Sequence, residues 1–273
     1  MDRVDAAGLV VTVASIAACL GSVWMVRVLA RRMHRGQPLV PPRSGAVVPW
    51  DGFDVIGVVG LVLGARIIAS AGLEQGSSMH AMLIANTLAM VAGTALAAGF
   101  LRAKGASWRA LGIAQVRPAE DLGIAWQGLV LVLAPLLAAA AFLNMVVPYT
   151  HPIVDYLSTH RDPLAVALVI LSAVVVAPVS EEFLFRRVLQ GWLEKKEPPL
   201  ERGAAIGLSA LAFALAHYGQ GLAWLPLFGL GVVLGYIVRQ TGAIAPAVIL
   251  HGLFNAVSVM LLLLGSARPE SAG

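Results

Sequence analysis

Residues 174–187 read Val174-Val-Val-Ala-Pro178-Val-Ser-Glu181-Glu182-Phe-Leu-Phe-Arg186-Arg187, so two adjacent glutamates stand in an otherwise apolar, membrane-type segment. An ionisable side chain at bilayer depth costs on the order of 3 kcal/mol even on lenient insertion scales. A chain that carries this cost at two adjacent positions is expected to use the carboxylates.

The composition of the whole chain is that of an integral membrane protein. Of its 273 residues, 59% are hydrophobic and 12% are charged, whereas a soluble domain carries about 25% charged residues. The net charge of +4 arises from basic residues in short loops between apolar runs. Such a distribution is a topology signal rather than a nucleic-acid-binding stripe, so no nucleic-acid partner is expected.

Eight apolar segments are long enough, or nearly long enough, to cross a bilayer, which takes about 20 residues. They are Ala6–Val28, Phe53–Leu73, His80–Leu101, Leu122–Val147, Pro163–Gln190, Gly203–His217, Leu222–Val238 and Ala243–Leu264. We therefore expect an all-α, polytopic transmembrane helical bundle of about eight helices. Pro178 removes a backbone donor inside the fifth segment and is expected to kink or break it just before the glutamates.

The basic residues predict the orientation of this bundle. With the segments in alternating directions, 15 of the 19 Lys and Arg residues fall on one side of the membrane and three on the other. Because basic loops stay in the cytoplasm, residues 29–52, 102–121 and 191–202 are expected there. We expect a multi-pass protein of a bacterial inner membrane, with a functional cavity that faces the cytoplasm.

The polar groups within the predicted helices gather in the last third of the chain. Five of them could take part in chemistry: Glu181, Glu182, His217, His251 and Asn255. His251 and Asn255 are four residues apart and share a helical face, and Glu182 and Arg186 have the same spacing in the order that favours an ion pair. Glu181 points about 100° away from Glu182. We infer a structural role for Glu182 and a role as base for Glu181, an assignment that a modest helix rotation would reverse.

These residue types are sufficient for hydrolysis. A carboxylate takes a proton from water, and an imidazole or an amide donates to the developing oxyanion. Glu181, His217 and His251 are also candidates for binding a divalent metal such as zinc. The helical HExxH pattern is absent, however, so the spacing does not establish a metal cofactor.

At these residues the sequence resembles the CPBP family, the CAAX-protease and bacteriocin-processing group also called Abi, which includes the Ras-converting CAAX endopeptidase. The family pattern is Glu-Glu-xxx-Arg, Phe-xxx-His and His-xxx-Asn. It stands here as Glu181-Glu182-Phe-Leu-Phe-Arg186, Phe213-Ala-Leu-Ala-His217 and His251-Gly-Leu-Phe-Asn255. The resemblance covers about Pro163–Leu264, and the first four predicted helices match the family only in being hydrophobic. We therefore expect N-terminal transmembrane helices 1–4 with cytoplasmic loops in 1–162, a family-like catalytic region in 163–265 and a short polar tail in 266–273.

The resemblance implies an intramembrane endopeptidase that cleaves a membrane-associated or lipid-modified protein or peptide. Membrane lipid and this substrate are the partners that it implies, and the oligomeric state stays open. By resemblance, Glu181 and His217 activate water, and His251 and Asn255 stabilise the oxyanion. Glu182, with the motif residues Arg186 and Phe213, would support the site. Both a metalloprotease and a metal-free glutamate mechanism fit the family.

Two other functions use the same residues. A proton- or cation-coupled transporter would place the paired glutamates in a pathway that opens alternately to both faces of the membrane. A non-catalytic scaffold or bacteriocin-immunity protein would tolerate alanine at every motif position.

The predicted topology raises a geometric problem for the site, because His217 ends a helix that begins on the cytoplasmic side and should lie near the outer face. It can meet Glu181 only if this short helix starts deep in the membrane or tilts steeply.

Overall fold

The computed structural model describes residues 3–74, 76–150, 152–160, 162–196 and 203–265, and the predicted tail 266–273 lies outside them. The regular secondary structure of these residues is entirely helical, which confirms the predicted all-α class. The first part of the chain forms α1 (Arg3–His34), α2 (Gly52–Ala71), α3 (Met79–Ala103), α4 (Pro118–Val146) and α5 (Pro152–His160). The second part forms α6 (Pro163–Ile170), η1 (Leu171–Val176), α7 (Ala177–Glu181), η2 (Glu182–Leu189), α8 (Gln190–Glu194), α9 (Ala204–Leu215), η3 (Gly221–Ala223), α10 (Trp224–Thr241) and α11 (Ala245–Gly265).

The helices match the eight predicted segments. Seven helical stretches in the described chain are long and apolar enough to cross a membrane, and α9 is a shorter apolar helix. The continuous stretch Pro163–Glu194, which comprises α6 to α8, counts as one of the seven. The protein is therefore an integral, multi-pass membrane protein. The short α5, between α4 and α6, is an element that the hydrophobic pattern did not predict.

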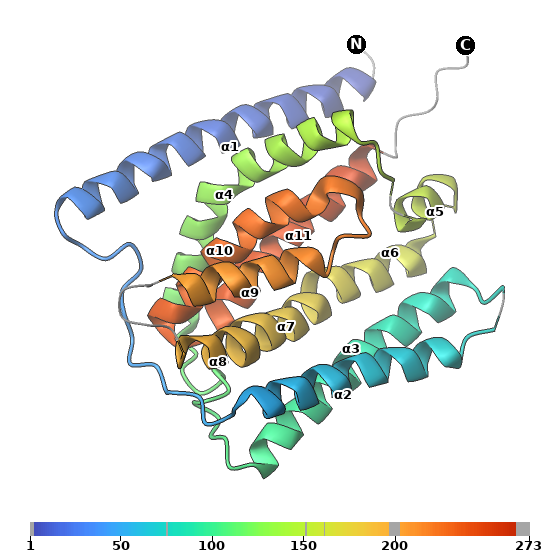
Figure 1. Cartoon of the computed structure of the whole chain (residues 1–273). Helices are drawn as coiled ribbons and strands as arrows, with labels where there is room; N and C mark the ends of the chain where they lie inside the picture. Colours follow the sequence, from blue (N-terminus) through green and yellow to red (C-terminus); the bar gives the residue numbers. More distant parts are fainter. Residues whose placement is uncertain (1–2, 75, 151, 161, 197–202, 266–273) are drawn as a thin grey trace.

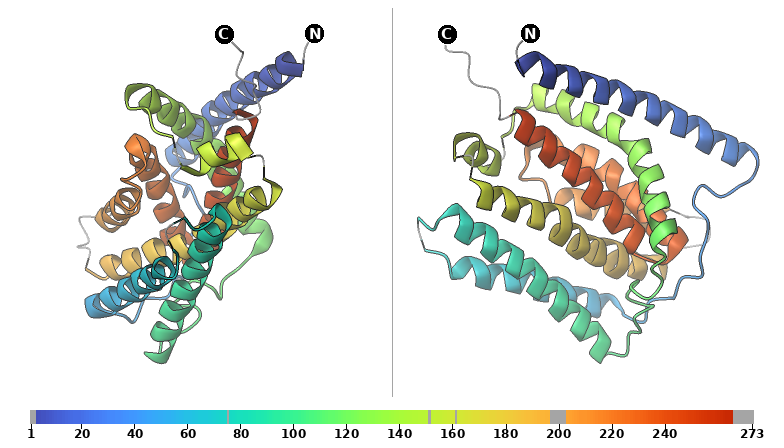
Figure 2. Two further views of the ribbon diagram at one scale, coloured as in Figure 1. Left: turned by 90° about the vertical axis from the view of Figure 1, so that its right-hand side faces the viewer. Right: turned by 180° about the vertical axis from the view of Figure 1, so that it is seen from behind.

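The helices are arranged around the stretch that carries the glutamates. The pair α1 and α4 lies along one edge of the bundle, and the pair α2 and α3 lies along the opposite edge (Figures 1 and 2). Between these pairs lie α9, α10, α11 and the α6–α8 stretch. The outer pairs pack closely where small residues allow it: a Cβ at Gly93 would lie 3.1 Å from Val62 Cα, and Ser22 donates a hydrogen bond of 2.7 Å to Val130 O.

Pro178 does not end the helix that contains it. The stretch from Pro163 to Glu194 stays helical and alternates between α- and π-helical turns, with π-helix in η1 and η2. At the end of η1 the N–H of Ala177 donates to Ser172 O, five residues back. Of the expected kink or break, the break is therefore wrong, because the wider π register accommodates the residue without an N–H within a continuous helix. Such π turns often occur at functional sites.

At one end of the bundle, basic side chains near the ends of the helices make contacts between separate elements. Lys195 Nζ donates to Trp50 O at 2.8 Å, and Arg239 pairs with Glu194 at 2.9 Å. Arg187 donates to Ala46 O at 2.8 Å. These contacts join the loop before α2 to the ends of α8 and α10, which the alternating topology places on the same side of the membrane. That this side is the cytoplasm stays a prediction.

Substitution of Gly252 tests the close approach of α11 to the π-helical segment η1. A Cβ at Gly252 would lie 2.7 Å from the carbonyl oxygen of Val174, whereas a Cβ at Gly60 would meet no atom within 4 Å. We expect Gly252→Ala to lower the free energy of unfolding by about 1–3 kcal/mol through overpacking. The matched control Gly60→Ala should not destabilise the protein. Apparent melting temperatures in detergent check this, and equal values for the two variants would contradict the packing.

Candidate active site

The two adjacent glutamates occupy different environments. The side chain of Glu182 is fully buried, whereas 18% of the Glu181 side chain is exposed. Glu182 Oε1 lies 3.0 Å from His251 Nδ1, and Glu182 Oε2 lies 3.3 Å from Arg186 Nε. The i,i+4 spacing that predicted the Glu182–Arg186 pair is thus realised, even though the local turn is π-helical.

The buried guanidinium of Arg186 is held by one aromatic and one polar neighbour. Its Cζ lies 4.7 Å from the centre of the Phe213 ring, a cation–π arrangement that partly offsets the loss of water. Its Nη1 lies 3.5 Å from Ser209 Oγ, which itself donates to Phe185 O at 2.7 Å. A buried ion pair is stable only when such additional contacts compensate for desolvation.

Phe213 also orients both histidines of the site. Its ring meets those of His217 and His251 edge to face, at centroid distances of 4.9 and 5.6 Å. The carbonyl oxygen of Phe213 lies 2.9 Å from His217 Nδ1. Because a carbonyl only accepts, Nδ1 of His217 carries a hydrogen, and its Nε2 is free to face the glutamates.

Glu181 faces the Nε2 atoms of both histidines. Its Oε1 lies 3.9 Å from His217 Nε2, and its Oε2 lies 3.7 Å from His251 Nε2. These separations are longer than a hydrogen bond. They suit groups that act together on a small molecule between them, because polar atoms further apart than about 3.5 Å are often bridged by water.

The short length of α9 explains how His217 reaches Glu181. The helix has 12 residues and is therefore about 18 Å long, against about 30 Å for the hydrocarbon core of a bilayer. A helix of this length does not cross the whole hydrocarbon core. The predicted conflict between His217 and Glu181 is absent from the structure, in which His217 Nε2 lies 3.9 Å from Glu181 Oε1.

Asn255 bonds to the backbone of the π-helical segment. Its Nδ2 donates to Ala173 O at 2.8 Å. In the register set by the bond from Ala177 to Ser172, the donor to Ala173 O would be the N–H of residue 178, which is proline. Asn255 therefore satisfies a carbonyl oxygen that Pro178 leaves without its backbone donor. This contact occupies one of the two amide hydrogens of Asn255 and leaves the other available.

The residues predicted to bind a metal are not arranged as a metal-ion site in the described part of the chain. Among these residues, no group of three or more His, Cys, Asp or Glu side chains is arranged to hold a metal ion. His251 Nδ1 is hydrogen-bonded to Glu182 Oε1, so only Nε2 of this ring could bind a metal. Zinc binding by Glu181, His217 and His251 therefore stays a prediction from the sequence.

The structure brings six of the seven residues that the sequence singled out into one connected cluster, and Asn255 lies one turn further along α11, bonded to Ala173 O. The η-segments and α7 supply Glu181, Glu182 and Arg186, α9 supplies Phe213 with His217 directly after it, and α11 supplies His251 and Asn255. Sequence reasoning missed Ser209. It stands four residues before Phe213, so the i,i+4 spacing could have placed it on the same helical face.

A partly exposed carboxylate between two imidazoles, beside a buried carboxylate–guanidinium pair, is an arrangement suited to the class of membrane-embedded hydrolases. The comparison with family models agrees with this class. Residues 163–257 match the model of a family described as type II CAAX prenyl endopeptidase Rce1-like. This segment therefore resembles the Rce1-like type II CAAX prenyl endopeptidases, and the resemblance supports an intramembrane endopeptidase in general terms. No curated protein and no solved structure matched the chain.

A double-mutant cycle tests the bond between Asn255 and Ala173 O. We expect Asn255→Leu to lower the free energy of unfolding by about 1–3 kcal/mol, because it leaves the carbonyl oxygen without a donor. Pro178→Ala restores a backbone N–H that can reach this oxygen. In a protein that already carries Pro178→Ala, Asn255→Leu should therefore lower the free energy of unfolding by at least about 0.5 kcal/mol less than it does in the wild type. Chemical or thermal unfolding in detergent measures both. Equal costs in the two backgrounds would show that Asn255 does not replace the missing donor.

Proposed function

We propose that the protein is an intramembrane endopeptidase in which Glu181 and His217 activate water for attack on a peptide bond. The substrate is a membrane-associated or lipid-modified protein or peptide. The observation that carries this proposal is the contrast between the two glutamates: Glu182 is buried and paired, whereas Glu181 is partly exposed and faces two imidazole Nε2 atoms.

The hydrogen bonds of the histidines favour a water molecule beside Glu181. With Nδ1 of His217 protonated toward Phe213 O, the neutral ring offers a lone pair at Nε2. A carboxylate oxygen and a lone pair do not bond to each other, but both accept from one water. Glu181 and His217 can then accept the two hydrogens of that water in hydrogen bonds. Glu181 takes one proton as the water oxygen attacks the carbonyl carbon and the C=O π electrons move to the carbonyl oxygen. As the tetrahedral intermediate collapses, its C–N bond breaks and Glu181 passes the proton to the leaving amine.

His251 and Asn255 are the proposed donors to the tetrahedral oxyanion. Glu182 Oε1 accepts from His251 Nδ1 at 3.0 Å, a contact that fixes the orientation of the ring. A protonated His251 donates from Nε2 on the side that faces Glu181. The second amide hydrogen of Asn255 supplies the other donor in this proposal.

The family match favours hydrolysis over the transporter and scaffold alternatives. The matched segment 163–257 contains every residue assigned a role. Its description names a CAAX prenyl endopeptidase, so peptides with a prenylated cysteine near the C-terminus are the first substrates to test. We also propose that the site opens toward the cytoplasm in a bacterial inner membrane, as the distribution of basic residues indicates.

The glutamates provide the first test of the mechanism. In proteoliposomes, Glu181→Gln should abolish cleavage, at least about a 1,000-fold loss in kcat, because the amide cannot take a proton from water. Its apparent melting temperature should stay near that of the wild type. The matched control Glu74→Gln changes an exposed glutamate outside the helices and should leave both properties intact. Full activity in Glu181→Gln would exclude this residue as the base.

The two glutamates should also differ in stability. Glu182→Gln removes the partner of a buried guanidinium, so we expect the free energy of unfolding to fall by about 3–5 kcal/mol. The melting temperature measured with a thermal-shift dye checks this value beside that of Glu181→Gln. If the two variants melted together, the assigned roles would be wrong.

The substrate class is tested with one peptide in two forms, farnesylated and unmodified. If the lipid anchors the substrate, the farnesylated form should have the lower KM with a similar kcat, since uniform binding changes KM alone. Cleavage of neither form, with Glu181-dependent cation uptake instead, would favour the transporter alternative.

A further inference from the structure

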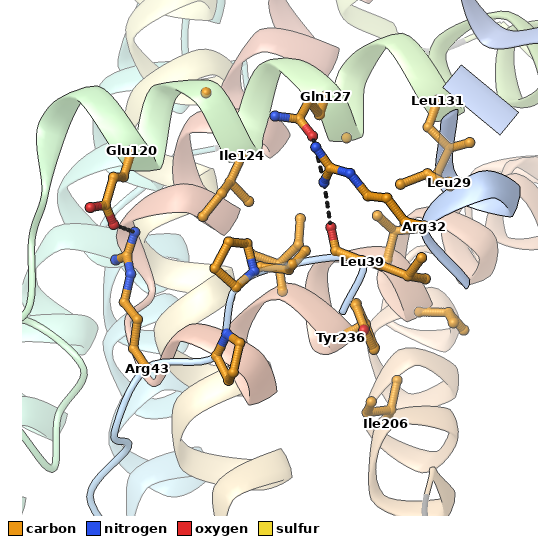
Figure 3. A pocket seen from close by; sticks show the side chains of 18 of the residues that line it. Leu29, Arg32, Leu39, Arg43, Glu120, Ile124, Gln127, Leu131, Ile206 and Tyr236 are labelled. Carbon is orange, nitrogen blue, oxygen red and sulfur yellow. Dashed lines mark hydrogen bonds and ion pairs between the residues drawn. The ribbon is translucent and has the colours of Figure 1, made fainter. Parts of the chain in front are cut away.

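A large cavity lies away from the glutamates, at the end of the bundle where the basic residues gather. Its volume is about 760 Å³, within the range of about 300–1,000 Å³ that is typical of small-molecule sites. The walls come from the last turns of α1, residues 39–43, the first half of α4, the start of α9 and the second half of α10 (Figure 3). Neither glutamate and neither histidine of the candidate site lines this cavity, so hydrolysis does not account for it.

Glycines keep the cavity open. A Cβ at Gly123 of α4 or at Gly207 of α9 would meet no other atom within 4 Å, although both residues line the cavity. Most of the other wall residues are aliphatic, such as Leu29, Ile124 and Val233. The interior is therefore an apolar space of the kind that a hydrocarbon chain fills.

One cation in this apolar wall has no charged partner among the residues that the structure describes. Arg43 pairs with Asp121 at 2.7 Å and with Glu120 at 3.1 Å, and Arg117 also pairs with Glu120 at 3.2 Å. These two guanidiniums are thus matched by two carboxylates. Arg32, in contrast, donates only to neutral oxygens, Leu39 O at 3.2 Å and Gln127 Oε1 at 3.4 Å (Figure 3).

We propose that this cavity binds an anionic phospholipid, with its phosphate at Arg32 and an acyl chain between α4, α9 and α10. No carboxylate among the described residues pairs with Arg32, and its contacts use only Nη1 of the five N–H donors of a guanidinium. A guanidinium binds phosphate through two parallel hydrogen bonds. Arg32 stands two residues from the end of the predicted span Gly8–His34, a depth at which lipid headgroups lie.

The charge at Arg32 distinguishes a phospholipid from the lipid chain of a substrate. A prenyl chain has no anionic group, so it would fill the aliphatic space and leave Arg32 without a counter-ion. A phospholipid with a net negative charge satisfies both parts of the cavity. Clustered basic residues at the cytoplasmic side of a membrane commonly attract such lipids.

Native mass spectrometry of the full-length protein tests the proposal, with phosphatidylglycerol and phosphatidylcholine supplied at equal concentration. We expect the wild type to retain the anionic lipid in preference to the zwitterionic one. Arg32→Gln should lower this retention about fivefold or more. Arg31→Gln removes the neighbouring exposed charge, which does not line the cavity, and should bind like the wild type.

A second pair of variants tests the apolar part of the cavity. Gly207→Leu places a side chain in the open space and should reduce lipid retention, whereas Gly60→Leu, outside the cavity, should not. Equal retention of both lipids, or anionic retention that neither Arg32→Gln nor Gly207→Leu changes, would overturn the proposal. Retention of a farnesylated peptide instead of the phospholipid, blocked by Gly207→Leu but not by Arg32→Gln, would also overturn it. Because the readout is lipid binding, it does not depend on protease activity.

Discussion

The buried charge of Glu182 is the constraint on which the catalytic region depends. A carboxylate with no exposed surface must be compensated by nearby charge and hydrogen bonds, and three parts of the chain contribute to this. Its own helix supplies Arg186, α11 supplies His251, and α9 supplies Phe213 and Ser209 around the guanidinium. Even α10 contributes by leaving space, because a Cβ at Gly231 would lie 3.3 Å from Arg186 Nη2. Satisfying one charge thus fixes how these helices pack.

The same packing leaves the neighbouring carboxylate free. Glu181 is one residue away but is partly exposed, and the short helix α9 brings His217 Nε2 to 3.9 Å from its Oε1. The π-helical turns before and after the glutamates complete the arrangement. They accept Pro178 and bring Asn255 to Ala173 O, which connects α11 to the glutamate-bearing helix for a second time. One glutamate therefore holds the structure together while the other remains available for chemistry.

Much of this could be predicted from the sequence, and the remainder depends on tertiary packing. Hydrophobicity located the eight segments, and i,i+4 spacing paired Glu182 with Arg186, because both signals are local. The π register around Pro178 was missed, since an isolated proline equally predicts a broken helix. Other contacts join residues that are far apart in the chain, so local patterns do not reveal them. Asn255 donates to Ala173 O, 82 positions away, and Arg32 donates to Gln127, 95 positions away. The helix α5 was missed because it is too short and too polar to resemble a membrane span.

The most direct test of the central claim is a high-resolution cryo-electron microscopy structure of the protein in a lipid nanodisc. The account predicts an ordered water within about 3 Å of both the Glu181 carboxylate and His217 Nε2, with Glu182 bonded to His251 and Arg186 and excluded from solvent. Two results would contradict it. One is a metal ion ligated by Glu181 and both histidines at about 2.1 Å. The other is a Glu181 side chain that is turned away from both imidazoles while Glu182 faces the solvent.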